Sequence, residues 1–202
     1  MADELSRALR AGAATPEGLE DASARLAARA QREGLLDVAY AMVDSPLGPL
    51  LAVGTEGGLV MLAYTDDGID DRLARIADAV SPRILEAPAR LDPARRELDE
   101  YFAGRRRDFD LPIDWALVHG YARAVLERTA AIPYGEARTY GEISAEAGSP
   151  RGARATGNAL GSNPIPIVIP CHRVLRSGGV LGGYTGGTER KRFLLDLEGS
   201  EL

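Results

Sequence analysis

The sequence predicts a mixed α/β fold of the α+β type, in which an N-terminal antiparallel-sheet domain with a flanking helix precedes a mostly helical C-terminal domain. Three apolar segments separated by turn sequences lie between residues 38 and 64. From residue 121 onward, apolar residues recur at helical spacing and are interrupted by Gly and Pro. The chain has 202 residues, of which 45% are hydrophobic. This length and composition allow one substantial core or two modest ones.

Residues 1–36 are expected to form an acidic helical extension. Ala, Leu and Arg alternate at helical spacing over residues 16–32, which predicts a helix there. Gly34 is positioned to end it. The face expected to be buried carries Leu19, Ala22, Leu26 and Ala30.

Residues 37–114 are predicted to form the N-terminal domain. Turn sequences at 45–49 and 55–58 separate apolar segments, a pattern typical of an antiparallel meander. The predicted strands are 38–43, 50–53 and 59–64, and the predicted helices are 70–80 and 93–103, the second with Leu98, Tyr101 and Phe102 as its apolar stripe.

Residues 115–202 are predicted to form the C-terminal domain, reached through a connection at 113–120. The first helix should bury one face, formed by Tyr121, Val125, Leu126 and Ala130. Thr139 and Glu142 have the spacing of a capping box, which predicts a short helix ending at Ala147. A second helix over 151–160 would present Arg151 and Arg154, so the pair has the outline of a winged-helix-like helix-turn-helix.

The sequence contains one cysteine, Cys171, beside one of its two histidines, His172. A β-branched segment at 165–169, interrupted by Pro166, predicts a buried edge-type or irregular strand leading to it. A structural cysteine would be buried and inert, whereas the basic neighbours Arg173 and Arg176 favour a lowered thiol pKa and a reactive thiolate. We therefore expect a nucleophilic cysteine.

The charge distribution is uneven. Net charge is −6 overall, but residues 1–120 carry 14 basic and 22 acidic side chains, whereas residues 121–202 carry 10 and 8. Only the C-terminal part could therefore approach a polyanion. The acidic N-terminus does not have the pattern of a signal peptide, no apolar run has the length of a membrane span, and an unpaired cysteine fits a reducing compartment. These features predict a cytoplasmic protein without membrane contact.

Several motifs together resemble the methylated-DNA–protein-cysteine methyltransferases, also called O6-alkylguanine-DNA alkyltransferases. The likeness extends over about residues 38–198 and is strongest from Ile132 onward. The motifs are Ile132 to Glu136, Tyr140 to Ile143, Gly157 to Ala159, Asn163-Pro164, Pro170 to Val174, and Gly183 to Gly187.

The resemblance implies direct DNA repair. An alkyl group, methyl above all, would pass irreversibly from O6-alkylguanine, and from O4-alkylthymine, to Cys171, consuming one protein per lesion. The partner would be double-stranded DNA, entered from the minor groove with the damaged base flipped out. The resemblance implies a monomer that needs no cofactor. Some relatives hold a structural zinc, but only His119 remains outside the Cys171–His172 pair, so no metal site is expected.

The resemblance also assigns roles near DNA. Arg154 matches an arginine finger that fills the gap left by the flipped base, and Tyr140 matches a tyrosine that promotes the rotation and contacts the base. Gly157 and Ala159 would keep the helix surface small. Arg151 and Arg173 complete the expected DNA-binding set.

In the pocket, the resemblance implies a relay in which Glu198 orients His172, and a water molecule links His172 to Cys171. Asn163 would tie the helix-turn-helix to the cysteine segment. The residues expected to contact the base are Tyr184, the backbone N–H of Thr185, and the carbonyl groups of Cys171 and Val174. Pro166 and the loop 176–182 would set the pocket width.

Two alternatives belong to other classes. A non-enzymatic lesion-binding protein or DNA-binding regulator could use the same helix-turn-helix, but it would not need Cys171. A cysteine hydrolase could use a Cys–His–Glu triad, but it would not need Tyr140 and Arg154.

Overall fold

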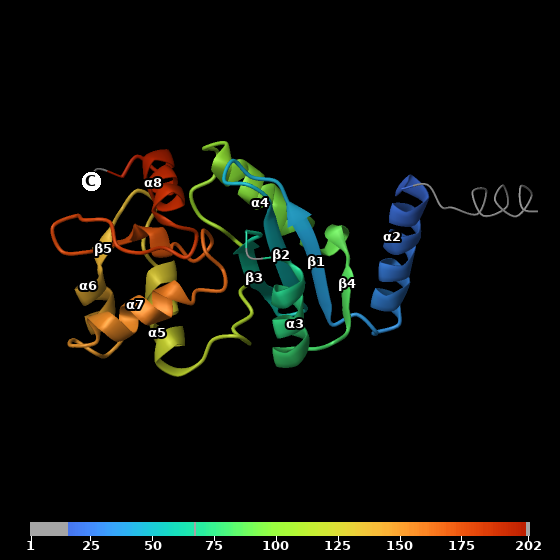
Figure 1. The fold of residues 1–202 in the computed structure, drawn as a ribbon, viewed down its shortest axis with the longest axis horizontal. Helices are drawn as coiled ribbons and strands as arrows, with labels where there is room; N and C mark the ends of the chain where they lie inside the picture. The colour runs from blue at the N-terminus through green and yellow to red at the C-terminus, as the bar shows by residue number, and fades with distance from the viewer. Residues whose placement is uncertain (1–15, 67, 201–202) are drawn as a thin grey trace, which may run out of the picture.

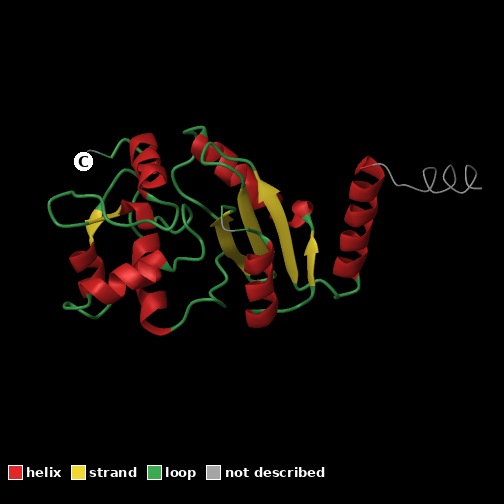
Figure 2. Cartoon of the chain, in the orientation of Figure 1, coloured by secondary structure: helices red, strands yellow, loops and turns green. Residues whose placement is uncertain are grey.

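The computed structural model describes residues 16–66 and 68–200 and consists of a sheet half and a helical half (Figure 1). The predicted α+β fold is confirmed, since strands gather in the N-terminal half and helices dominate the C-terminal half (Figure 2). In chain order the elements are α2 (Pro16–Arg32), β1 (Val38–Val43), β2 (Leu50–Thr55), β3 (Gly58–Tyr64), α3 (Asp70–Ala79), β4 (Ile84–Glu86), the 3-10 helix η1 (Pro88–Leu91), α4 (Asp92–Phe102), α5 (Gly120–Ala130), β5 (Arg138–Thr139), α6 (Tyr140–Glu146), α7 (Ala153–Gly161), the 3-10 helix η2 (Cys171–Arg173), β6 (Val174–Leu175) and α8 (Thr188–Leu197).

The sheet has the strand order β3-β2-β1-β4. The predicted meander is confirmed, because β1, β2 and β3 pair antiparallel in sequence order. The fourth strand, β4, pairs parallel with β1 and was not predicted, since three residues are too few to show a period. Alternate side chains of β2 enter different clusters. Leu51 packs with Ile76 of α3, whereas Leu50 packs with Leu98 of α4. Both sheet faces are therefore buried.

Helix α2 has the predicted bounds but not the predicted face. Leu26 is 56% exposed and Ala22 is also exposed, whereas Ala27 and Ala30 pack with Leu36, Ala39 and Ala87. The side chain of Leu19 lies outside the described residues. Helix α2 lies beside the edge strand β4, away from the helical half (Figure 1). The buried face of α2 carries only small side chains, so the spacing of the larger apolar residues could not indicate which face is buried.

Helices α6 and α7 give the predicted helix-turn-helix outline. The capping box of α6 is confirmed: the Thr139 side chain accepts from the Glu142 N–H at 3.2 Å, and the Glu142 carboxylate accepts from the Thr139 N–H at 2.6 Å. Helix α7 begins at Ala153, so Arg151 lies in the preceding turn and not on the helix. In α5, Val125 and Leu126 are buried as predicted, but Ala130 is exposed and Thr129 is buried instead.

The segment that leads to Cys171 is a series of turns, so the predicted edge-type strand is wrong. Ile167 has a φ of 76°, and the Ile169 N–H donates to the Ile165 carbonyl at 2.9 Å. The Asn163 side chain holds these turns, because Nδ2 donates to the Ile169 carbonyl at 2.9 Å and Oδ1 accepts from the Ile165 N–H at 3.0 Å. The buried β-branched side chains of residues 165–169 therefore pack in the core without belonging to a β-sheet.

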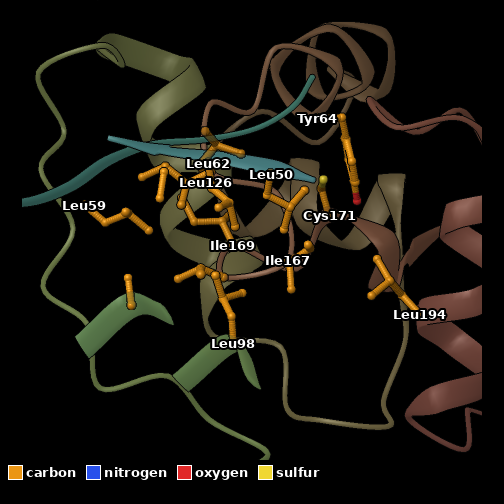
Figure 3. Close-up of a cluster of buried hydrophobic side chains, with 14 of the residues drawn as sticks. Leu50, Leu59, Leu62, Tyr64, Leu98, Leu126, Ile167, Ile169, Cys171 and Leu194 are labelled. Carbon is orange, nitrogen blue, oxygen red and sulfur yellow. The ribbon is translucent and has the colours of Figure 1, made fainter. Parts of the chain in front are cut away.

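The two halves share one hydrophobic core. Leu50, Leu62 and Leu98 from the sheet half pack with Leu126 and Ile169 from the helical half (Figure 3). Backbone hydrogen bonds add to this contact, since the Leu62 N–H donates to the Pro164 carbonyl at 2.8 Å. Among the helices in the described part of the chain, none has both the length and the apolar character that a membrane crossing requires.

Candidate active site

Cys171 is the first residue of η2 and lies at the margin of the shared core, close to Tyr64 (Figure 3). It is only 4% exposed. Asn163 Nδ2 donates to its Sγ atom at 3.2 Å while also bonding the Ile169 carbonyl. One amide therefore fixes both the turn before the cysteine and the sulfur itself, as a hydrogen-bond donor suited to a thiolate.

The expected lowering of the thiol pKa is not found. Burial raises the pKa of Cys171 to about 11, against the hydrogen bond from Asn163 and the charge of Lys191, which act to lower it. Arg173 does not counter the burial because its guanidinium group is directed to a carboxylate instead. The thiol is therefore protonated near neutral pH, so a base must help to form the thiolate.

Arg173 is buried in an ion pair with Glu198, not exposed to DNA as predicted. Its Nε donates to Oε2 of Glu198 at 2.8 Å, and its Nη2 donates to Oε1 at 2.9 Å. Nη1 donates to the Ile132 carbonyl at 2.5 Å. With 4% of its surface exposed, Arg173 has no free donor face for a phosphate. At position 173, the basic residue near Cys171 therefore forms a structural ion pair.

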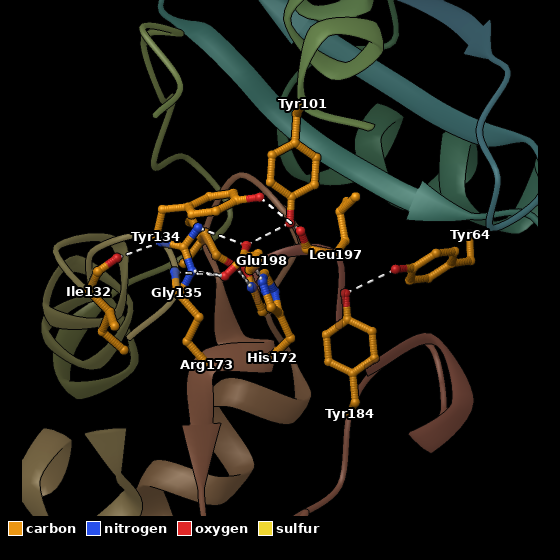
Figure 4. Close-up of polar contacts among 12 residues, drawn as sticks. Tyr64, Tyr101, Ile132, Tyr134, Gly135, His172, Arg173, Tyr184, Leu197 and Glu198 are labelled. Atoms are coloured by element: carbon orange, nitrogen blue, oxygen red, sulfur yellow. Dashed lines mark hydrogen bonds and ion pairs between the residues drawn. The ribbon is translucent and has the colours of Figure 1, made fainter. Parts of the chain in front are cut away.

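His172 and Glu198 form the carboxylate–histidine pair that the resemblance implied (Figure 4). His172 Nε2 and Glu198 Oε1 are 2.9 Å apart, and both side chains are fully buried. Burial lowers the pKa of His172, which therefore rests neutral. Burial acts to raise the pKa of Glu198, but hydrogen bonds from His172 and Arg173 outweigh it and lower this pKa to about 2. A neutral imidazole beside a carboxylate holds its proton on Nε2.

The other imidazole nitrogen is the candidate base. His172 Nδ1 is buried and has no hydrogen-bond partner among the described residues. With the proton on Nε2, Nδ1 presents a lone pair. The arrangement can accept a proton at Nδ1 while Glu198 stabilises the resulting imidazolium.

Lys191 is the only lysine of the sequence, and it is completely buried. Its Nζ donates to the Val174 carbonyl at 2.6 Å and to the Gly183 carbonyl at 3.5 Å. Burial lowers its pKa to about 8, with the Cys171 thiolate acting to raise it. The cation that favours the thiolate is therefore this lysine, which sequence reasoning missed. Its uniqueness among 24 basic residues was the available signal.

A cavity of about 700 Å³ opens beside Tyr184, between the helix-turn-helix and the loop after Cys171. Thr185 Oγ1 donates to the Gly161 carbonyl at 3.3 Å, which ties the loop that carries Tyr184 and Thr185 to the end of α7. The residues that line the cavity include Tyr140, Arg154, Gly157, Arg176, Tyr184 and Thr185. Five of these were predicted to contact the base or DNA.

The other predicted contacts do not line this cavity, namely Arg151, Ala159, Pro166, Arg173 and Val174. Pro166 lines a separate cavity of about 330 Å³, with Asn163 and Thr185, and does not line the larger one. Ala159 is 5% exposed and packs in the core, so its small side chain serves helix packing and not a DNA surface. Gly157 does line the larger cavity, where an added Cβ would lie 3.8 Å from the Tyr140 ring.

Two family profiles match the chain. Residues 38–115 match the ribonuclease-like domain of 6-O-methylguanine DNA methyltransferase, and residues 120–200 match its DNA binding domain. The chain belongs to the 6-O-methylguanine DNA methyltransferase family. The family resemblance seen in the sequence is thereby confirmed.

Relatives in this methyltransferase family align with most of the chain. It is 39% identical over 161 residues to the methylated-DNA–protein-cysteine methyltransferase of Methanosarcina acetivorans, covering 80% of this chain and 98% of that protein. It is 36% identical to the constitutive methylated-DNA–protein-cysteine methyltransferase of Bacillus subtilis, covering 79% and 94%. Among solved structures, Mycobacterium tuberculosis OGT in complex with DNA has a TM-score of 0.67 and 39% identity, covering 79% and 92%.

Proposed function

We propose that the protein repairs DNA by transferring an alkyl group from O6 of guanine to Sγ of Cys171. A carbon–sulfur bond forms as the carbon–oxygen bond breaks, and guanine leaves as its anion, which takes a proton. The observation that carries the proposal is one buried thiol that lies next to a neutral histidine–carboxylate pair, near a cavity large enough for a base. The thioether cannot be reversed by these groups, so each molecule reacts once.

Thiolate formation is the first step of the proposed mechanism. A water molecule between His172 Nδ1 and Cys171 would carry the thiol proton to the imidazole, whose Nε2 is held by Glu198. Two groups then stabilise the thiolate, the Asn163 amide at 3.2 Å and the buried charge of Lys191. Together they offset part of the effect of burial, which favours the neutral thiol.

The residues that line the cavity would recognise the flipped base. Tyr184 lines the cavity, and burial raises its pKa well above the usual value of 10, so its hydroxyl stays protonated and can donate to the leaving guanine. The Val174 carbonyl already accepts from Lys191, and its remaining lone pair is available to the exocyclic amine. The Thr185 N–H would contact the alkylated oxygen.

Double-stranded DNA is the proposed partner, docked by its minor groove on α7. Arg154 of α7 and Tyr140 of α6 both line the cavity and both come from the helix-turn-helix. This placement suits a side chain that enters the base stack beside a base rotated into the cavity. Arg151, exposed in the turn before α7, would contact phosphate.

An intact-mass experiment tests the proposal. The protein is incubated with duplex DNA that contains one O6-methylguanine, and we expect a stoichiometric gain of one methyl group on Cys171. Cys171→Ala, which keeps the DNA-facing residues, should bind the duplex and gain no mass. Binding without an adduct in the unaltered protein would favour a lesion-binding regulator, and repeated turnover would favour a hydrolase. Either result would refute the proposal.

Alkylation is expected to destabilise the spent protein. Cys171 is 4% exposed within the packed core, and an added methyl group in such a site costs about 1–3 kcal/mol. Thermal unfolding of the methylated protein should therefore begin several degrees lower than that of protein incubated with undamaged duplex. Identical melting curves would contradict this expectation.

We also propose that the protein acts as a monomer in the cytoplasm. The reaction needs Cys171 as a free thiol, and a reducing compartment maintains that state.

A further inference from the structure

We propose that the sheet half supplies two positioning residues for the reaction, Tyr101 for the Glu198–His172 pair and Tyr64 for Tyr184. Both tyrosines project from the sheet half toward the helical half, and each ends on a side chain of the active site (Figure 4). The inference rests on the proposed function. It assigns a chemical task to a half of the molecule that holds neither the cysteine nor the DNA-facing helices.

Tyr101 is a further donor on the Glu198 carboxylate, beside His172, Arg173 and the Gly135 N–H. Its hydroxyl donates to Glu198 Oε1 at 2.6 Å, the oxygen that also faces His172 Nε2 at 2.9 Å. Burial, and then the charge of Glu198, raises the pKa of Tyr101, so the phenol keeps its proton and can only donate to the carboxylate. The shared oxygen therefore stays an acceptor toward His172, which keeps the imidazole proton on Nε2 and the lone pair on Nδ1.

The Tyr101 ring is fixed before the hydroxyl reaches Glu198. It is fully buried, and its centroid lies 5.4 Å from that of Phe102 and 5.3 Å from that of Phe109. Tyr134 adds an edge contact at 6.2 Å. A ring held on several sides leaves the hydroxyl little freedom, so the position of Glu198 is set by α4 as well as by the C-terminal end of α8. Phenylalanine at 101 would keep this packing and remove only the donor.

Tyr64 is the positioning residue for Tyr184. Its hydroxyl lies 2.9 Å from the Tyr184 hydroxyl, and the Arg190 guanidinium lies 4.2 Å from its ring centroid. The backbone of Gly186 packs so closely against the ring that an added Cβ would collide with it. Tyr64 is thus confined at the end of β3, and it directs the hydroxyl of a residue that lines the cavity.

The two contacts should affect different steps. Tyr101 acts through the base that takes the thiol proton, and that task matters less as rising pH increases the fraction of thiolate. Tyr64 acts through a residue that faces the guanine, and that task remains at every pH. Dependence of the rate on pH therefore separates the two roles from each other.

The test compares single-turnover methyl transfer from saturating O6-methylguanine duplex between pH 6 and pH 9.5. We expect Tyr101→Phe to be about tenfold slower at pH 7, with the difference shrinking to about twofold at pH 9.5. The rate of Tyr64→Phe should be about fivefold lower than that of the unaltered protein, and this ratio should be the same at each pH. Tyr134→Phe is the matched control, because it also removes a hydroxyl, which donates to the Leu197 carbonyl at 3.0 Å, without touching the carboxylate. Its rate should stay within about twofold of the unaltered protein throughout.

A Tyr101→Phe deficit that is absent, or equal at all pH values, would overturn the role of Tyr101. A Tyr64→Phe deficit that is absent, or that closes with rising pH, would overturn the role of Tyr64. In a single-turnover reaction, partial loss of folded protein lowers the final amount of adduct, whereas the expected deficits lie in the rate constant, so the two effects are read separately. If the unaltered protein forms no adduct, the proposed function itself fails, which is a different outcome from unaltered profiles in the variants.

Discussion

Glu198→Gln is expected to lower the free energy of unfolding by about 3 kcal/mol and to slow methyl transfer about a hundredfold at pH 7. Glu198 accepts from Arg173, His172 and Tyr101, and it is buried. Removing its charge leaves the Arg173 guanidinium buried without a counter-ion, a change that typically costs several kcal/mol. The imidazole also loses the carboxylate that orients it and stabilises its protonated form.

The pKa of Glu198 determines how its contribution to stability changes with pH. The pKa of Glu198 is lowered to about 2, below its usual value of 4.5, so its contribution is complete above pH 4.5 and is lost as the pH falls toward 2. The difference in stability between the unaltered protein and Glu198→Gln should therefore be largest near neutral pH and shrink below pH 4.5. Urea unfolding at a series of pH values measures it.

Glu136→Gln is the control for this experiment. Glu136 pairs with Arg138 at 3.2 Å on the surface, where such pairs contribute about 0–1 kcal/mol. It should change neither the rate nor the stability by a comparable amount. A Glu198→Gln variant that is as stable as the control, or whose stability deficit is independent of pH, would show that the buried ion pair does not anchor the site.

Motif residues reach the site largely as the sequence indicated, because their spacing reflects contacts within one half of the chain. Cys171, His172 and Asn163 lie within ten residues, and their turn is held by local hydrogen bonds. The capping box of Thr139 and Glu142 is equally local. Local chemistry of this kind is visible in sequence order.

Contacts across the two halves could not be read in the same way. Tyr101 appeared only as part of an apolar stripe, and its hydroxyl meets a carboxylate 97 positions further along the chain. Arg173 was expected to contact DNA and to lower the thiol pKa, yet it neutralises Glu198. Which charges neutralise one another depends on the packing of the two halves, so the raised thiol pKa could not be foreseen from a basic neighbourhood.

Arg154→Ala is expected to slow repair of duplex DNA about a hundredfold while leaving reaction with a free O6-alkylguanine base within about twofold of the unaltered rate. Arg154 is exposed on α7, and it lines the same cavity as Tyr140 and Tyr184. Flipping a base from a duplex costs a few kcal/mol, and a side chain that occupies the vacated stack returns part of that cost. A hundredfold effect corresponds to about 2.7 kcal/mol, which is within this range.

Arg151→Ala separates insertion from simple charge attraction. Arg151 is exposed a few residues away, in the turn before α7, and it carries the same charge. Its loss should weaken duplex binding several-fold in a salt-dependent manner, and repair at saturating DNA should be nearly unchanged. Arg154→Ala should instead remain slow at saturating duplex and at low salt, because the missing step follows binding. Equal losses on duplex and free base, or rescue of Arg154→Ala by low salt, would assign Arg154 to the backbone contacts and leave base extrusion to Tyr140.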